Sequence, residues 1–206
     1  MKHVFIVNPI SGHQDALELI PSIESYFKNN PKDYVINITQ YPKHATEIAS
    51  SYHNSDDVTL YACGGDGTIN EVFNGLAPGV AMAVIPVGTG NDFFRMLQIK
   101  ETKLKDILAS TIEGKEVYVD GGLSDHGRFV EALSMGFDAD VAFDANKISR
   151  NKWVPSKLVY MSAVLKNIVF RKTYHMTIDI DGTTIDEKLL LIAIMNGKDY
   201  GGGFTP

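Results

Sequence analysis

Three apolar runs in the first half of the chain each end in a turn that is rich in glycine and small polar residues. The runs at 3–7, 58–62 and 80–85 have the length and continuous hydrophobicity of buried strands, and segments with helical spacing lie between them. A further strand is predicted at 34–39. Strands that alternate with helices indicate a parallel sheet with right-handed crossovers. Because the carboxyl ends of parallel strands meet at one edge of the sheet, where open α/β sheets bind ligands, we expect the three turns to form one site.

The pattern changes near residue 116. Short strand signals follow at 117–119, 121–123, 128–135, 174–180 and 183–195. A helical stretch lies at 155–170, and Asp-Gly at 181–182 is a strong two-residue hairpin signal. Strands joined by tight turns indicate an antiparallel arrangement. We therefore predict a Rossmann-like parallel α/β domain at 1–118, followed by a partial antiparallel β-sandwich domain at 119–206.

Composition narrows the class of protein further. The 206 residues are 44% hydrophobic and 10% aromatic, which is enough to build a core. The single cysteine, Cys63, excludes a disulfide framework and an all-cysteine metal site, and the histidines lack the spacing of zinc ligands. No apolar stretch approaches the roughly 18 residues of a membrane helix, and the N-terminal apolar run is too short for a signal peptide. We therefore expect a cytoplasmic protein.

Charge is distributed unevenly along the chain. The formal net charge of −6 argues against nucleic acid as a general partner. Residues 147–172, however, carry seven Lys or Arg and no Asp or Glu, together with Trp153, Tyr160 and Phe170. Two interpretations stay open: a peripheral contact with the anionic inner face of a membrane, or a helix that packs on the second domain with solvated lysines.

The turn at 63–68 reads Cys-Gly-Gly-Asp-Gly-Thr and lies where a strand meets a helix. Glycines there let the backbone turn sharply and let a large anion approach, and the N-terminus of the helix favours phosphate. Asp66 by itself would repel phosphate. It indicates a divalent cation that bridges it to a nucleotide, or a role in positioning or deprotonating a hydroxyl. Thr68 is expected to cap the helix or bind a phosphate oxygen; the alternative is an ordinary tight turn with a capping Asp.

Two further turns have the same character. One runs from Gly88 to Asn91 after the strand at 80–85, and the other runs from Asn8 to Gly12 after the strand at 3–7. Neither contains the Gly-Lys-Ser/Thr of a Walker loop or the G-x-G-x-x-G fingerprint. Each alone is compatible with ordinary turn chemistry, but three together predict phosphate chemistry of another type.

Four motifs together resemble the diacylglycerol kinase-like lipid kinases, within the superfamily that they share with NAD kinase. The motifs are NPISG at 8–12, GGDGTINEVFNGL at 64–76, IPVGTGNDFFR at 85–95 and NGKDYGGGFTP at 196–206. The sequence GGDGT alone does not separate lipid kinases from NAD kinases. The residues that follow it, and the turn from Gly88 to Asp92, are similar to the lipid-kinase branch.

The resemblance implies ATP and Mg²⁺ as cofactors and transfer of the γ-phosphoryl group to a lipid hydroxyl, with the β-sandwich as the lipid-substrate domain. It also implies catalytic and metal-binding roles for Asp66. The residues that it implies for ATP binding are Asn8, Pro9, Ser11, Gly12, Thr39, Gly64, Gly65, Asp66, Gly67, Thr68, Ile69, Asn70 and Thr89.

The chain departs from the family pattern at three points. Phe94 replaces the small residue that is usual before the arginine, and Glu131 stands where asparagine is common. In the family, the triple-glycine segment leads on to further strands, an acidic metal-binding loop and a late glutamate that is implied as the general base. This sequence ends at Pro206. We therefore expect a truncated catalytic region that is weak or inactive alone.

Two other functions stay open. An NAD kinase-like phosphotransferase would consume ATP with NAD in place of a lipid. A nucleotide-binding module would bind ATP without turnover. The sequence does not name the lipid, because diacylglycerol, phosphatidylglycerol, sphingoid bases and undecaprenol all offer a hydroxyl beside long apolar chains.

Overall fold

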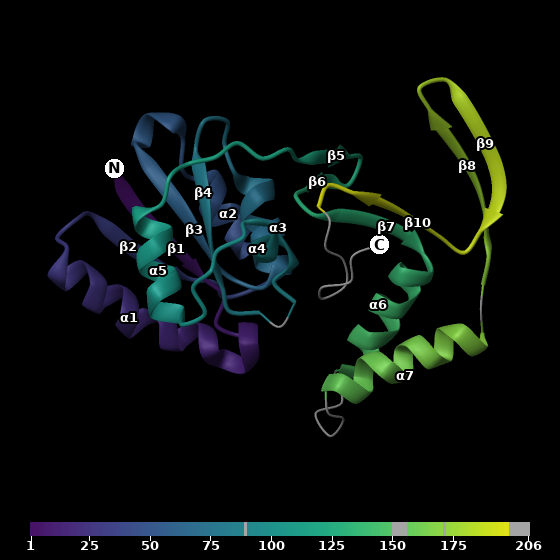
Figure 1. Cartoon of the computed structure of the whole chain (residues 1–206), viewed down its shortest axis with the longest axis horizontal. Coiled ribbons are helices and arrows are strands. Elements are labelled where there is room, and N and C mark those ends of the chain that lie inside the picture. The colour runs from purple at the N-terminus through teal and green to yellow at the C-terminus, as the bar shows by residue number, and fades with distance from the viewer. Residues whose placement is uncertain (89, 150–155, 171, 198–206) are drawn as a thin grey trace. The chain divides into compact units, whose positions relative to one another are not determined.

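The computed structural model describes residues 1–88, 90–149, 156–170 and 172–197 (Figure 1). Four parallel strands form one sheet in the order β2-β1-β3-β4. The strands are β1 (Lys2–Val7), β2 (Tyr34–Ile38), β3 (Val58–Gly64) and β4 (Ala81–Pro86). All four predicted strands are confirmed, with ends that differ by one or two residues.

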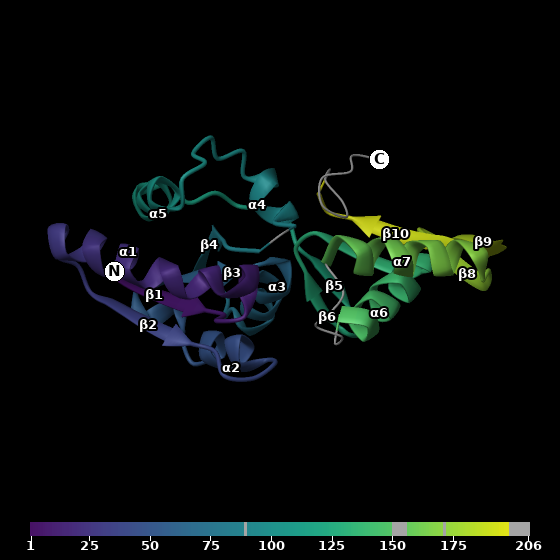
Figure 2. The same ribbon diagram turned by 90° about the horizontal axis from the view of Figure 1, so that it is seen from below.

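Helices connect these strands and cover both faces of the sheet (Figure 2). They are α1 (Asp15–Asn29), α2 (His44–Ser50), α3 (Asp66–Gly75), α4 (Asp92–Met96) and α5 (Leu104–Glu113), with short 3-10 turns η1 (Ser11–Gln14) and η2 (Asn54–Asp56). Among the residues described, no helix combines the length and the hydropathy that crossing a membrane requires.

Alternate residues of β1 supply two separate cores. Val4 and Ile6 pack with apolar side chains of α2 and α3 on one face, whereas Phe5 and Val7 pack with those of α1 and α5 on the other. Residues of β3 are buried along its whole length. A parallel strand that is covered on both faces carries a continuous apolar run, which explains why these strands were predictable.

A hairpin is fastened to the end of α3 by an arginine. The strands β5 (Gly122–Ser124) and β6 (Gly127–Phe129) pair antiparallel. Arg128 Nη2 donates to the carbonyl oxygens of Asn74 (2.8 Å) and Leu76 (2.9 Å), and the Arg128 backbone N–H donates to Asn74 Oδ1 (2.8 Å). The guanidinium also lies 5.1 Å from the centre of the Phe73 ring. Carbonyl groups that a helix end leaves without partners are thereby satisfied.

The chain divides into two compact units. The first contains Met1–Glu131 together with Asn196 and Gly197, and the second contains Ala132–Met195. Elements of the second unit are β7 (Ala132–Gly136), α6 (Phe137–Ser149), α7 (Ser156–Val169), β8 (Tyr174–Ile180), β9 (Thr183–Leu189) and β10 (Leu191–Met195). β7 pairs with β10 and β8 pairs with β9, both antiparallel, which confirms the predicted change of architecture. The predicted domain boundary at 118/119 stays a prediction.

Some predicted elements differ from the structure. The strand predicted at 117–119 is wrong: no strand includes these residues, and their apolar side chains are exposed. β-branched and aromatic side chains favour a strand only when a partner strand is present. The strand predicted at 183–195 is divided after Leu189, and helices α5 and α6 were not predicted.

Candidate active site

The turns that follow the parallel strands lie at one edge of the sheet. The N–H groups of Asn8, Thr39 and Val87 each donate to a carbonyl oxygen at the end of a neighbouring strand, at distances of 2.9 to 3.0 Å. These hydrogen bonds extend the ladder past the strands and hold the turns in register. The structure therefore brings together the three turns whose convergence we expected.

The turns after β3 and β4 touch through their backbones. A Cβ atom built on Gly88 would lie 2.4 Å from the Cα of Gly65, which is too close for any residue with a side chain. Asn91 braces the second turn, because its Oδ1 accepts the Gly88 N–H (3.1 Å) and its Nδ2 donates to the Gly88 carbonyl (2.8 Å). Asn91 has a φ of 55°, a left-handed conformation that asparagine tolerates.

A side-chain hydrogen bond ties the first turn to α3. Asn8 Nδ2 donates to Thr68 Oγ1 at 2.9 Å, and the Thr68 side chain is almost completely buried. Gly65 caps α3 without a side-chain hydrogen bond, so the predicted capping role of Thr68 is wrong. Its hydroxyl instead joins two of the three turns.

Gly67 differs from the other glycines of the site. It is exposed in the first turn of α3, where a Cβ atom would meet nothing within 4 Å and where φ is not left-handed. Folding therefore gives no steric reason for glycine at this position. An anion that approaches the helix N-terminus closely would give one. Asn70, one turn further along α3, is also exposed.

Asp66 is the first residue of α3 and is half-buried. Its Oδ2 accepts the Asn91 N–H (2.9 Å), whereas its Oδ1 is buried and accepts no hydrogen bond from the residues described. Burial raises the pKa of Asp66 and the nearby charge of Asp92 raises it further, while the backbone N–H groups of residues 91–93 act in the opposite direction. A buried carboxylate oxygen without a partner suits a cation or a hydroxyl hydrogen.

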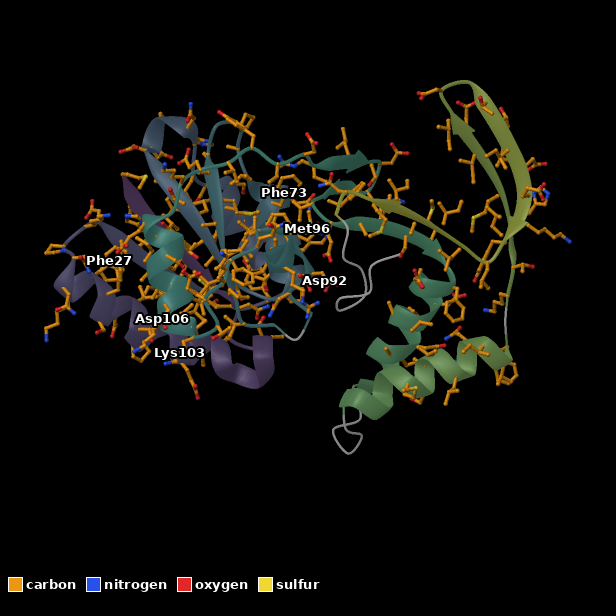
Figure 3. The ribbon with its side chains drawn as sticks, in the orientation of Figure 1. Phe27, Phe73, Asp92, Met96, Lys103 and Asp106 are labelled. Carbon is orange, nitrogen blue, oxygen red and sulfur yellow. The ribbon has the colours of Figure 1, made fainter. Side chains whose placement is uncertain are left out.

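Asp92 and Glu131 form a carboxyl pair beside Asp66. Asp92 begins α4 (Figure 3), is 5% exposed, and accepts a hydrogen bond from Arg95 Nη1 at 2.6 Å. Burial and the charges of Asp66 and Asp92 raise the pKa of Glu131 to about 8, against an opposing effect of Arg95. The one sign of this pair in the sequence was the glutamate at a position where the family commonly has asparagine.

The remaining predicted residues lie in different environments. Thr39 is buried at the end of β2. The side chain of Ile69 is fully buried in the core, and its N–H donates to the Gly65 carbonyl oxygen (3.1 Å). Thr89 lies outside the described residues. Half-buried in the first turn are Asn8, Pro9, Ser11 and Gly12.

The core position predicted for Cys63 is confirmed, whereas the metal-binding role predicted for Asp66 is not tested. Cys63 is buried, as expected for a core residue, and burial raises the pKa of its thiol. Within the described ranges, no group of three or more His, Cys, Asp or Glu side chains is arranged to hold a metal ion. The role of Asp66 toward Mg²⁺ therefore stays a prediction.

Two family models match this chain. The model of the diacylglycerol kinase catalytic domain matches residues 2–123, and that of the YegS C-terminal NAD kinase beta sandwich-like domain matches residues 131–205. A diacylglycerol kinase of Bacillus subtilis (strain 168) is 27% identical over 200 residues, covering 96% of this chain and 65% of that protein. A diacylglycerol kinase of Staphylococcus aureus (strain MRSA252) is 30% identical over 190 residues, covering 90% of this chain and 59% of that protein. The chain thus spans less than two thirds of the length of these relatives.

Two solved structures from Bacillus anthracis str. Sterne superpose on the whole chain. One, described as a diacylglycerol kinase, has a TM-score of 0.65 at 24% identity, and 67% of its length is covered. The other has a TM-score of 0.71 at 26% identity, and 69% of its length is covered. These likenesses confirm the predicted fold class.

Proposed function

Because this chain belongs to the diacylglycerol kinase catalytic-domain family, we propose that it transfers the γ-phosphoryl group of ATP to the hydroxyl of a lipid. The observation that carries the proposal is the convergence of three glycine-containing turns at the N-terminus of α3. Such an edge suits a polyphosphate, because the first N–H groups of a helix attract anions. The names of the relatives support a lipid as the acceptor.

The phosphates of ATP would lie against Gly67 and the first turn of α3. The open space around Gly67 supports this placement, since, apart from its chain neighbours and the adjoining backbone of α3, no described atom lies within 4 Å of where a Cβ atom would stand. The Asn8–Thr68 hydrogen bond and the Gly65–Gly88 contact would keep the turns rigid as the nucleotide binds. Rigid backbone donors lose little entropy on binding, which favours affinity.

Asp66 is the residue that would hold Mg²⁺. Its orphaned Oδ1 is a hard oxygen ligand of the type that this ion prefers. Bound Mg²⁺ would neutralise part of the charge on the β- and γ-phosphates. The Asn91 N–H holds Oδ2 and thereby orients the carboxylate.

In the proposed reaction, the lipid hydroxyl oxygen bonds to the γ-phosphorus while the bond from this phosphorus to the β–γ bridging oxygen breaks. ADP leaves with the electron pair, and the hydroxyl proton passes to a base. The Asp66 carboxylate at the start of α3 would position the hydroxyl or accept its proton.

A phosphorylation panel tests the proposal. The protein is incubated with radiolabelled ATP, Mg²⁺ and one acceptor at a time: diacylglycerol, phosphatidylglycerol, a sphingoid base, undecaprenol or NAD. We expect label in one lipid and none in NAD, and Asp66→Asn should abolish it. Label in NAD alone would support an NAD kinase-like enzyme, and nucleotide binding without any labelled acceptor would support a binding module. Either result would contradict the proposed function.

A lipid acceptor also requires contact with a membrane, which we propose for the exposed face of α7. Met161, Leu165 and Ile168 are each more than half exposed and lie on one side of this helix. The basic excess of residues 147–172 complements an anionic bilayer. Residues 150–155 and 171 of this stretch lie outside the described residues.

Vesicle sedimentation tests this contact. Leu165→Glu should reduce binding to phosphatidylglycerol vesicles, while Leu123→Glu, at an even more exposed apolar position in the hairpin β5–β6, should not. Equal binding of both variants and the wild type would refute a role for α7.

A further inference from the structure

Two stacked aromatic rings follow the end of β2. The rings of Tyr41 and His44 have centroids 4.5 Å apart and planes inclined by 15°. The Tyr41 hydroxyl donates to Glu47 Oε2 at 2.7 Å. His44 Nδ1 accepts the Gln40 N–H at 3.1 Å. The His44 N–H donates to the Tyr41 carbonyl oxygen (3.1 Å) and closes a turn in which Lys43 has a φ of 71°. The protein therefore holds both rings of this aromatic pair in place.

Much of the Tyr41 ring is open to solvent. His44 stacks on one face of the ring, yet Tyr41 is 50% exposed. The stacked pair of Phe5 and Tyr61 differs, because both of its rings are buried in the core and contribute to folding there. Burial gives no such reason for the rigid placement of Tyr41. A flat ring that is held rigidly at the surface suits stacking against a flat ligand.

The aromatic pair follows a strand that ends close to the proposed phosphate site. The Thr39 N–H donates to the Val7 carbonyl oxygen at 2.9 Å, so the chain just before Tyr41 lies beside the turn after β1. In the sheet, β1 alone separates β2 from β3. Neighbouring strands lie about 4.8 Å apart, which puts the ends of β2 and β3 roughly 10 Å from each other. The ribose of a nucleotide separates the base from the phosphates by a comparable length.

Helix α2, which begins at His44, lies against α3. Thr46 Oγ1 donates to the Glu71 carbonyl oxygen at 2.9 Å. A Cβ atom on Gly75 would lie 2.2 Å from the Thr46 carbonyl oxygen, so the two helices pack closely. Both helices contribute to the same core on one face of the sheet. The aromatic pair therefore lies on the same face as the helix whose exposed Gly67 marks the proposed phosphate site.

We infer that the open face of Tyr41 stacks on the adenine ring of ATP, so that the end of β2 binds the base while the first turn of α3 binds the phosphates. The inference rests on the proposed function, because it takes ATP as the ligand. His44 supports the ring of Tyr41 from the opposite side. Since every base has a π face, stacking should give affinity for ATP without strict selection against GTP.

Calorimetry with two ligands distinguishes contacts to the base from contacts to the phosphates. Tyr41→Ala should weaken binding of ATP about tenfold or more, as loss of a base–aromatic stack does, and should leave the affinity for inorganic tripolyphosphate within about twofold of the wild type. Tyr41→Phe keeps the ring, so its affinity for ATP should stay within about threefold of the wild type. Tyr118→Ala removes a fully exposed tyrosine elsewhere in the first unit and serves as the matched control.

Fluorescence gives a direct readout of the stack. Tyr41→Trp places an indole ring beside the proposed adenine site. We expect ATP to quench its emission and tripolyphosphate to leave it unchanged. The sequence has one native tryptophan, Trp153, and a titration of the wild type measures its contribution.

The outcomes separate this inference from the proposed function. An unchanged affinity of Tyr41→Ala for ATP, or equal losses of ATP and tripolyphosphate binding, would overturn the inference even in an active lipid kinase. The expected loss of ATP binding alone, in a protein that labels no lipid, would support the stack and contradict only the proposed function.

Discussion

Asp66 and Gly67 are neighbours in the sequence, but their surroundings differ: Asp66 is held by contacts within the protein, whereas Gly67 borders open space. The protein holds one oxygen of Asp66 through the Asn91 N–H and packs Gly90 against it. Around Gly67 it leaves open space. The first residue of α3 is therefore positioned by the protein, and the second is left accessible to a ligand.

A substitution at Gly67 should change the free energy of unfolding and the affinity for ATP in opposite directions. Because alanine is favoured over glycine within a helix by up to about 1 kcal/mol, Gly67→Ala should raise the free energy of unfolding slightly. The new methyl group should nevertheless weaken ATP binding by about tenfold, which corresponds to about 1.4 kcal/mol. Urea titration and isothermal calorimetry with ATP measure the two effects.

Gly88→Ala is the matched control. A methyl group there would lie 2.4 Å from the Gly65 Cα, so this variant should lower the free energy of unfolding. If Gly67→Ala also destabilises the protein, or leaves ATP affinity unchanged, our interpretation of the open space is wrong.

The raised pKa of Glu131 predicts that the free energy of unfolding depends on pH. In the folded protein its pKa is raised from 4.5 to about 8, so the native state keeps a proton that the unfolded chain has lost. The resulting stabilisation is complete below about pH 4.5 and is lost as the pH rises to about 8, with a slope of up to about 1.4 kcal/mol per pH unit.

Urea unfolding between pH 5 and pH 9 measures this dependence. Glu131→Gln has no group to titrate, so its free energy of unfolding should fall less steeply over this range than that of the wild type. His3, whose pKa burial lowers, changes stability with the opposite sign in both proteins, so the difference between them isolates Glu131. Parallel curves would contradict the raised pKa.

At the scale of elements, the end of α3 and the hairpin β5–β6 are joined by Arg128. Its guanidinium contacts the carbonyl groups of Asn74 and Leu76, and its backbone is bonded in both directions to the Asn74 side chain. The helix that carries the candidate site at its N-terminus is thus fixed at its C-terminus as well.

Removal of the Arg128 side chain should destabilise the folded protein. Arg128→Ala leaves partly buried carbonyl groups without a donor and should lower the free energy of unfolding by about 2–3 kcal/mol. Arg128→Lys should recover only part of it, because an ammonium group lacks the fixed fork of a guanidinium. Chemical denaturation provides the measurement, with Lys115→Ala as an exposed basic control. A loss as small as that of the control would show that the contacts contribute little.

The elements that sequence reasoning predicted are those with strong local signals. The strands β1, β3 and β4 are continuous apolar runs, and the turns after them are rich in glycine, so the parallel sheet and its edge followed from short segments. In α5, the buried residues Ile107, Leu108 and Ile112 form a helical face, although no helix was predicted at 104–113. The proximity of Asp92 and Glu131 has no local signal, because it depends on how distant segments pack.

At the scale of the whole molecule, burial is concentrated in the first unit. Strands β1 and β3 are buried almost throughout, whereas most residues of β9 are exposed. Among the described residues of the second unit, the buried apolar side chains are Val141 and Ala163. Apolar burial drives folding, so the two units should differ in local stability.

Hydrogen exchange measured by mass spectrometry should show this difference. Peptides from β1 and β3 should exchange orders of magnitude more slowly than peptides from β8 and β9, because they open only with the whole core. Added ATP should slow exchange in the first turn of α3. Equal protection of β3 and β9 would contradict the distribution of burial.

The position of β1 between β2 and β3 has a consequence for synthesis of the chain. Val4 of β1 pairs with Val35 on one side and with Leu60, 56 positions later, on the other. At translation rates of about 5–20 residues per second, β1 therefore leaves the ribosome roughly 3 to 11 s before β3 exists to cover it. During that interval a strand with four consecutive apolar residues, Val4 to Val7, has an unpaired edge, and a nascent chain of this kind is a natural client for a ribosome-associated chaperone.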